Sequence, residues 1–170
     1  RCKGFLGVHV GPLEESIETG TGPGTRLVQL RIGVVLSDEG GALVEFKRPL
    51  RFGIAAILGN GKQMISWIHI EDLCRLFIYA IENENCSGAY NAVAPVPVNN
   101  KTLTLLLAAA IRGKFFIALH IPVFVLKIML GQRSLEVLKS ATVSCGKLKE
   151  TGFVFLYPSI EAALRELSGK

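Results

Sequence analysis

Cysteine is scarce in this 170-residue sequence, which contains only Cys2, Cys74, Cys86 and Cys145. No two of them form a C-x-x-C pair, and no histidine lies at zinc-ligand spacing from them. Neither a thioredoxin-type redox motif nor a zinc finger is therefore expected. We interpret the four cysteines as reduced thiols of a cytoplasmic protein, and we predict no metal site.

Apolar runs long enough to cross a bilayer are also missing, since a spanning helix needs about 20 apolar residues. The segment 103–111 is too short, and the segment 115–130 is interrupted by His120, Pro122 and Lys127. The N-terminal residues lack the continuous apolar stretch of a signal peptide. We predict no membrane association; the rival hypothesis, a membrane-surface protein that uses residues 115–130, could be tested with liposomes.

Positive charge is in modest excess but is not concentrated. The chain has 19 Lys and Arg against 14 Asp and Glu, and its densest basic group is Lys47, Arg48 and Arg51. A nucleic-acid-binding protein gathers such charge on one face or in one run, so we predict no nucleic-acid partner. The composition, 49% hydrophobic and 19% charged, is that of a folded chain.

Motifs of several catalytic machineries are absent as well, including G-x-S-x-G and H-E-x-x-H. The glycines at 20, 22 and 24 follow a helix-like segment and precede a strand-like one. This is the reverse of the strand–glycine–helix order that directs backbone N–H groups and the helix dipole at a pyrophosphate. The glycine-rich stretch is therefore predicted to be a loop.

Segments typical of strands and helices alternate along the chain. Residues 26–36 have the almost continuous apolar character of a strand buried on both faces of a parallel sheet. In the segment 71–82, Leu73, Phe77, Ala80 and Ile81 recur at three- and four-residue spacings, as in an amphipathic helix. We predict strands at 26–36, 64–70, 89–93, 115–119 and 142–145, and helices at 13–19, 42–52, 71–82, 102–112, 122–130, 147–151 and 158–167. This alternation indicates an α/β architecture.

Three polar residues stand where the predicted strand 64–70 meets the following helix. His69 lies between two isoleucines, and a lone histidine in that setting is more often a hydrogen-bonded structural residue than a catalytic base. Asp72 and Glu71 fall in the first helical turn, where negative charge complements the helix dipole.

Several motifs, in this order and spacing, resemble those of extended short-chain reductases and epimerases. Residues 66–73 (SWIHIEDL) are similar to their aromatic-I-H-V-x-D-hydrophobic motif, residues 90–92 (YNA) to the Tyr-Asn strand that follows it, and residues 31–36 to the sixth Rossmann strand. A subgroup called epimerase family proteins is more similar still. It shares the segments 40–43, 49–53, 58–63, 91–95, 121–124 and 152–164. The resemblance covers about residues 26–168.

The resemblance implies the C-terminal portion of an extended short-chain reductase. Residues 1–44 would be the tail of an incomplete Rossmann NAD(P)-binding domain, residues 45–118 a small α+β substrate-side region, and residues 119–170 a helical C-terminal module. The parent would be an NAD(P)-dependent epimerase or oxidoreductase acting on a sugar-like or other small carbonyl or hydroxyl substrate. Its cofactor fingerprint would precede Arg1, so we expect this chain to be inactive and to bind no dinucleotide tightly by itself.

The sequence departs from the family pattern at key positions. Leu6 and Val10 stand at the places of the Tyr-x-x-x-Lys pair, in which Lys lowers the pKa of Tyr so that the phenol can move a proton. We therefore assign no catalytic residue to this chain. Ile65 stands where nucleotide-sugar epimerases commonly carry a phosphate-pairing Arg, which argues against a UDP-sugar substrate.

Candidate ligand contacts follow from strand position and from the resemblance. Ligands bind beyond the carboxyl ends of parallel strands, so Arg31 and Gly33 are predicted to lie near the nicotinamide end of NAD or NADP. Family position alone suggests four substrate contacts, namely Lys47, Arg51, Trp67 and His69. The rival hypothesis is a non-enzymatic remnant or partner-binding domain, in which the apolar edge at 26–36 mediates homodimerisation or other association.

Overall fold

The computed structural model describes residues 16–17, 22, 24–122, 124–125, 140 and 142–169. The predicted helices at 13–19 and 122–130 and the glycine-rich loop lie largely outside these residues. The strands are β1 (Val28–Ile32), β2 (Val34–Leu36), β3 (Ile54–Leu58), β4 (Met64–Ile65), β5 (Trp67–His69), β6 (Gly88–Ala92), β7 (Val98–Asn99) and β8 (Ile117–Ile121). The helices are α2 (Ala42–Leu50), α3 (Ile70–Glu82), α4 (Asn100–Arg112), α7 (Gly146–Glu150) and α8 (Ile160–Leu167).

Parallel pairing dominates the described strands. β1 pairs with β6, β2 with β5 and β3 with β8, each pair being parallel, whereas the short β4 and β7 are antiparallel. Parallel neighbours require long crossover connections, and α3 lies within the connection between the parallel neighbours β1 and β6. The predicted α/β class is confirmed.

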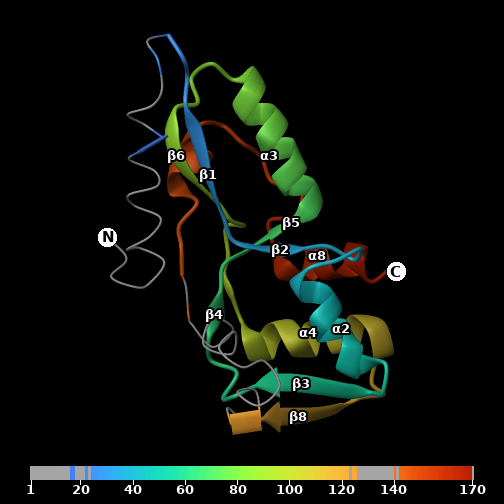
Figure 1. Ribbon diagram of the computed structural model, residues 1–170. Coiled ribbons are helices and arrows are strands. Elements are labelled where there is room, and N and C mark those ends of the chain that lie inside the picture. Colours follow the sequence, from blue (N-terminus) through green and yellow to red (C-terminus); the bar gives the residue numbers. More distant parts are fainter. Residues whose placement is uncertain are drawn as a thin grey trace.

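Two hydrophobic clusters hold the elements together. The first gathers side chains from β2, α2, α4 and α8, including Leu36, Leu43, Leu103 and Leu164. The second lies among β6, α3, α7 and the segment 153–155. Figure 1 shows β1, β6 and α3 at one end of the molecule and α2, α4, β3 and β8 at the other.

β5 forms the wall between the two clusters. Successive side chains of a strand point to opposite faces, and accordingly Trp67 packs in the first cluster while Ile68 packs in the second. Both residues are fully buried.

Capping side chains and a glycine fix the ends of helices α4 and α8. The Asn99 side chain accepts a hydrogen bond from the N–H of Thr102 at the start of α4, and the Ser159 hydroxyl accepts one from Ala162 at the start of α8. α4 stops at Gly113, whose φ of 64° is a left-handed conformation that glycine adopts without strain. These caps explain why helices are found where the sequence predicts them at 102–112 and 158–167.

Three sequence predictions need correction. The strand at 26–36 exists, but it is divided at Gly33, and Ile32 and Val34 are 47% and 36% exposed, so it is not buried on both faces. The predicted strand at 142–145 is irregular. There the Val143 N–H donates to the Ser66 hydroxyl, and the Asn91 side-chain amide donates to the Ser144 carbonyl. These side-chain bonds replace a strand ladder.

The third correction concerns the face of α3 that packs against the core. Leu73, Leu76 and Ala80 are buried, but Phe77 and Ile81, which share the predicted spacing, are 46% and 72% exposed. The helix itself, predicted at 71–82, is confirmed at Ile70–Glu82.

Candidate functional site

Three chain segments meet around Gly33, at the carboxyl ends of β1 and β6. The Gly33 N–H donates to the Ala92 carbonyl at 3.2 Å, and the next N–H, that of Val34, donates to the Ser66 carbonyl at 2.8 Å. The Ala94 N–H donates to the Trp67 carbonyl at 2.6 Å. We call this arrangement the Gly33 junction, and it links the strand β1–β2 to both β5 and the end of β6.

The junction leaves no room for a side chain at position 33. A Cβ atom there would lie 2.6 Å from the Ser66 carbonyl oxygen and 2.7 Å from Val93 Cγ1. Arg31, two residues earlier, is exposed and pairs in register with Asn91 of β6. Arg31 and Gly33 thus stand where the sequence places them, at the carboxyl end of a parallel strand pair.

Trp67 and His69 lie on β5, and both are buried. The Trp67 ring is fully buried and its Nε1–H donates to the Val96 carbonyl at 2.9 Å. His69 caps helix α3, because its Nδ1 accepts a hydrogen bond from the Glu71 N–H at 3.2 Å. This bond assigns the proton of the neutral ring to Nε2. Nε2 lies 2.9 Å from a Glu166 carboxylate oxygen of α8 and donates to it.

Asp72 has a structural role that its local sequence does not reveal. Its side chain is buried and accepts hydrogen bonds from the N–H groups of Leu156 and Tyr157 at 2.8 and 2.9 Å. Arg75 donates to it as well, at 3.1 Å. Its place in the first turn of α3 predicts an interaction with the helix dipole, but its hydrogen-bond donors lie 84 and 85 positions away along the chain. The carboxylate therefore fixes the segment before α8 to the first turn of α3.

Tyr157 completes this polar group. Its ring stacks on His69 with centroids 3.9 Å apart, and its hydroxyl donates to the Glu71 carboxylate at 3.1 Å. Desolvation of the phenol, together with its hydrogen bond to Glu71 and the negative charges of Glu71, Glu166 and Asp72, raises the pKa of Tyr157 above its ordinary value.

The tyrosine titration of the chain should therefore contain a late step that belongs to Tyr157. A free phenol ionises near pH 10. Because the folded phenol keeps its proton where the unfolded one loses it, its contribution to stability is complete below that pH and is lost as the pH rises through the folded pKa. The difference in ultraviolet absorbance between the wild type and Tyr157→Phe should show a step above pH 10. The variant keeps the ring on His69, and a step at or below pH 10 would contradict the prediction.

Lys47 and Arg51 lie on and just after α2. The Lys47 ammonium donates to the Leu167 carbonyl at 2.8 Å, and so holds the last turn of α8. Arg51 is exposed, and its backbone carbonyl accepts a hydrogen bond from the Arg112 guanidinium. α8 therefore joins two predicted residues, since Lys47 contacts Leu167 and His69 contacts Glu166.

The six predicted residues do not form one cluster. Gly33 and Trp67 share the Gly33 junction, His69 and Lys47 meet at α8, and Arg51 lies at the far end of α2. None of the six lines the open groove of about 720 Å³ between the turn after β3 and the end of β8. That groove is lined by Gly59, Asn60, Lys62, Gln63, His120, Pro122 and Ser140.

Among the described residues, no three His, Cys, Asp or Glu side chains are grouped closely enough to hold a metal ion. None of the helices there has the length and apolar character needed to cross a membrane.

Known proteins similar to this chain are epimerase family proteins. The epimerase family protein of Staphylococcus aureus strain MRSA252 is 38% identical over 147 residues, which are 86% of this chain and 48% of that protein. The chain is similar to the C-terminal part of epimerase family proteins. It spans about half the length of the curated relatives that it matches. A family model described as a domain of unknown function (DUF1731), which is the C-terminal domain of such epimerases, matches residues 121–167.

Solved structures agree with the epimerase family fold. The human epimerase family protein SDR39U1 (isoform 2), solved with NADPH, is 34% identical with a TM-score of 0.79, over 87% of this chain and 50% of that chain. The UDP-glucose 4-epimerase of Thermotoga maritima, solved with UDP-glucose, has a TM-score of 0.70 at 21% identity, over 95% and 51% of the two chains. That second likeness shows the fold alone. The chain corresponds to the C-terminal portion of the epimerase family fold.

Proposed function

We propose that this chain supplies the last Rossmann strands, the substrate-side region and the C-terminal module of an NAD(P)-dependent epimerase or oxidoreductase. The substrate would be sugar-like or another small carbonyl or hydroxyl compound. The observation that carries the proposal is the Gly33 junction at the carboxyl ends of the parallel strands β1 and β6. In open α/β sheets, ligands bind beyond such ends. The proposal includes a cytoplasmic location, with which the free thiols of Cys74, Cys86 and Cys145 agree.

The residues present fit one end of a dinucleotide. Arg31 is an exposed residue two positions before Gly33, and we propose that the nicotinamide end lies near this strand end. The pattern G-x-G-x-x-G, which approaches a pyrophosphate, does not occur in these 170 residues. The human relative was solved with NADPH, which supports a nicotinamide cofactor as the source of hydride chemistry. We therefore propose that the 170-residue chain alone binds neither NAD nor NADP tightly and turns no substrate over.

The proposed substrate contacts divide into two kinds. Arg51 is exposed and is available to a ligand, whereas Trp67 and His69 are buried and would shape the wall formed by β5. Lys47 would act by holding α8 against α2.

A chimera tests the proposal. Joining the N-terminal half of the S. aureus relative to this chain ahead of Arg26 should create NADPH binding, because the combined chain would contain both ends of the cofactor site. Titration calorimetry of the 170-residue chain alone should give a Kd weaker than about 0.1 mM. In the chimera, Arg31→Ala should weaken NADPH binding about tenfold, as expected for one lost charge-assisted contact.

Arg48→Ala is the matched control, because Arg48 is also exposed and, among the described contacts, its side chain pairs only with Glu45 of its own helix. It should leave the affinity of the chimera unchanged. A chimera that folds but binds no NADPH, or tight binding by the 170-residue chain alone, would contradict the proposal.

The second candidate is a binding domain without nicotinamide chemistry. The observation that favours it is the exposure of Ile32 and Val34 along β1 and β2. An apolar strand edge is a site of association. A folded chimera without affinity for either dinucleotide would make this candidate the leading one.

A further inference from the structure

A groove of about 720 Å³ opens at the carboxyl ends of the parallel strands β3 and β8. Its described walls come from the turn that follows β3, from His120 and Pro122 at the end of β8, and from Ser140. We call it the β3–β8 groove. In α/β proteins, ligands bind beyond the carboxyl ends of parallel strands, and small-molecule pockets have volumes of about 300–1,000 Å³. The position and the size of the groove therefore both match those of a small-molecule site.

The turn that forms one wall of the groove is tied down by hydrogen bonds. The Gly59 N–H donates to the Ile121 carbonyl at 2.9 Å, which joins the turn to the end of β8. The Asn60 side chain accepts a hydrogen bond from the Lys62 N–H at 3.0 Å. Because the backbone at Lys62 is already held, a ligand that binds there does not have to order it.

The groove offers hydrogen-bond donors and a positive charge. Within the part of the chain that the structure describes, the Lys62 ammonium has no hydrogen-bond or ion-pair partner. The Ser140 hydroxyl accepts from the Met64 N–H at 2.9 Å, so its own O–H stays available to donate. His120 is exposed, and its ring carries at least one N–H donor in either protonation state. None of the described lining residues is acidic, so the groove suits a negatively charged ligand.

The amount of positive charge favours a ligand with one anionic group. Among the described lining residues, Lys62 is the one that is a lysine or an arginine. Position 65, on the neighbouring strand β4, is an isoleucine, which cannot neutralise a second phosphate. A carboxylate or a phosphate monoester matches one ammonium with two further donors, whereas a diphosphate would leave charge unpaired.

Strand β4 connects the groove to the Gly33 junction. The Met64 N–H is bonded at the edge of the groove, and the Ser66 carbonyl, two residues later, accepts the Val34 N–H in the junction. Figure 1 shows β4 between the β3–β8 pair and the β2–β5 pair. A substrate with its anionic group in the groove would extend along β4 toward the strand end where we place the nicotinamide.

We propose that the β3–β8 groove binds the anionic group of the substrate, a small carbonyl or hydroxyl compound that bears one carboxylate or phosphate monoester. Lys62 pairs with the anion, and His120 and Ser140 donate hydrogen bonds to it. That this ligand is the substrate rests on the proposed function, whereas the binding of an anion in the groove does not.

Nuclear magnetic resonance titration of the isotope-labelled 170-residue chain tests the anion preference. Glucose 6-phosphate and glucuronate should each bind at least about tenfold more tightly than glucose, and they should shift the amide signals of Lys62 and Ser140. Lys62→Ala should remove this preference. The position is exposed, so signals far from the groove should stay unchanged.

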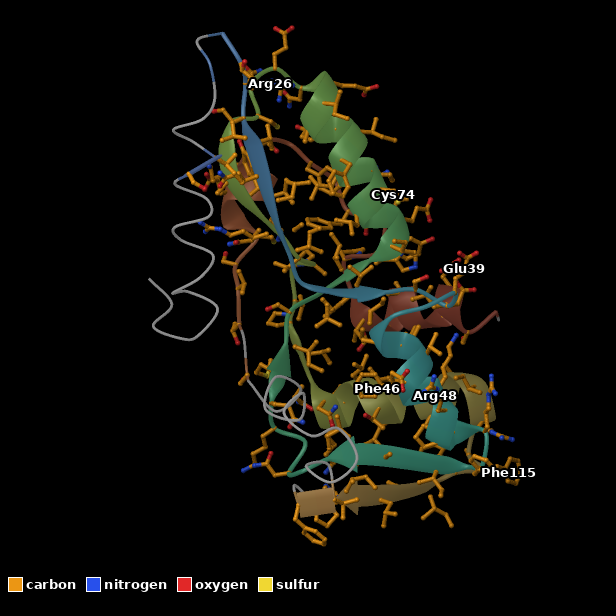
Figure 2. All side chains as sticks on the ribbon, viewed as in Figure 1. Arg26, Glu39, Phe46, Arg48, Cys74 and Phe115 are labelled. Atoms are coloured by element: carbon orange, nitrogen blue, oxygen red, sulfur yellow. The ribbon has the colours of Figure 1, made fainter. Side chains whose placement is uncertain are left out.

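Lys114→Ala is the matched control, since it removes the same charge from another exposed position. Lys114 precedes Phe115, which Figure 2 shows at the opposite end of the β3–β8 pair from the end of β8. This variant should keep the preference for the charged sugars. Whichever charged sugar binds more tightly identifies the anion, and either result supports the proposal.

Three outcomes would overturn the proposal: equal affinities for the charged and neutral sugars, a preference that Lys62→Ala retains, or binding of UDP-glucose more than about tenfold tighter than that of glucose 6-phosphate. The last would show a site built for a diphosphate. A failure of the proposed function is distinguishable from these. If the chimera described above binds no NADPH while the Lys62-dependent preference persists, the nicotinamide proposal fails and the groove remains an anion site.

Discussion

Replacing Asp72 with alanine is expected to lower the free energy of unfolding by about 2–4 kcal/mol. The substitution leaves the N–H groups of Leu156 and Tyr157 without their acceptor, and it removes the partner of Arg75. A buried donor that loses its acceptor costs about 1–3 kcal/mol. In a chain of this length the melting temperature should fall by about 5–15 °C. Asp72→Asn should show a smaller loss, because the amide keeps one acceptor oxygen but directs an NH₂ group at the other donor.

Two measurements separate this effect from a general loss of charge. Asp38→Ala removes an exposed carboxylate from the loop after β2 and should change stability by less than about 0.5 kcal/mol. Hydrogen exchange of the Leu156 and Tyr157 amides should speed up at least about tenfold in Asp72→Ala, because their protection comes from this carboxylate. Unchanged exchange at those two amides would show that the contact does not hold the segment before α8.

Gly33→Ala should destabilise the protein by about 1–3 kcal/mol through overpacking. The added methyl would lie 2.6 Å from the Ser66 carbonyl oxygen and 2.7 Å from Val93 Cγ1. Ser66 and Val93 belong to the two segments that the junction joins, so they cannot both retreat without breaking its hydrogen bonds. The penalty comes from lack of space and not from the backbone angle, since Gly33 does not have a positive φ.

Gly40→Ala provides the matched control for this change. Nothing lies within 4 Å of a Cβ built at Gly40, and its φ is not positive either. Chemical denaturation should therefore place Gly40→Ala within about 0.5 kcal/mol of the wild type. Equal stabilities for Gly33→Ala and Gly40→Ala would show that the junction tolerates expansion.

Local pattern was enough to predict most of the fold. The spacing of apolar residues locates α3 and α4, and the β-prone run at 26–36 locates β1 and β2. The sequence could not show which side of α3 is buried, because Phe77 and Ile81 are as apolar as Leu76. That choice is made by packing against the segment 153–155, which is more than 70 positions away. The strand predicted at 142–145 is wrong for a related reason, since the backbone there forms hydrogen bonds with the side chains of Ser66 and Asn91.

The candidate site was harder to predict than the fold. The position of Gly33 follows from its place at the end of a strand, but the close approach of Ser66 and Val93 is a tertiary contact. His69 caps α3 and contacts Glu166, and its role as a substrate contact stays a prediction. The local sequence could not predict the contacts of Asp72, because its two backbone donors come from a distant segment.

The packing of α8 has a consequence for the order of events during synthesis. Leu43 and Leu167 belong to the same hydrophobic cluster, although the ribosome makes them 124 positions apart. At about 5–20 residues per second, roughly 6–25 s separate their emergence. During that interval Leu36, Leu43 and Leu103 have no Leu164 or Leu167 to cover them. Closure of this cluster must therefore follow translation of α8, and until then the nascent chain is a natural client for chaperones that shield apolar surface.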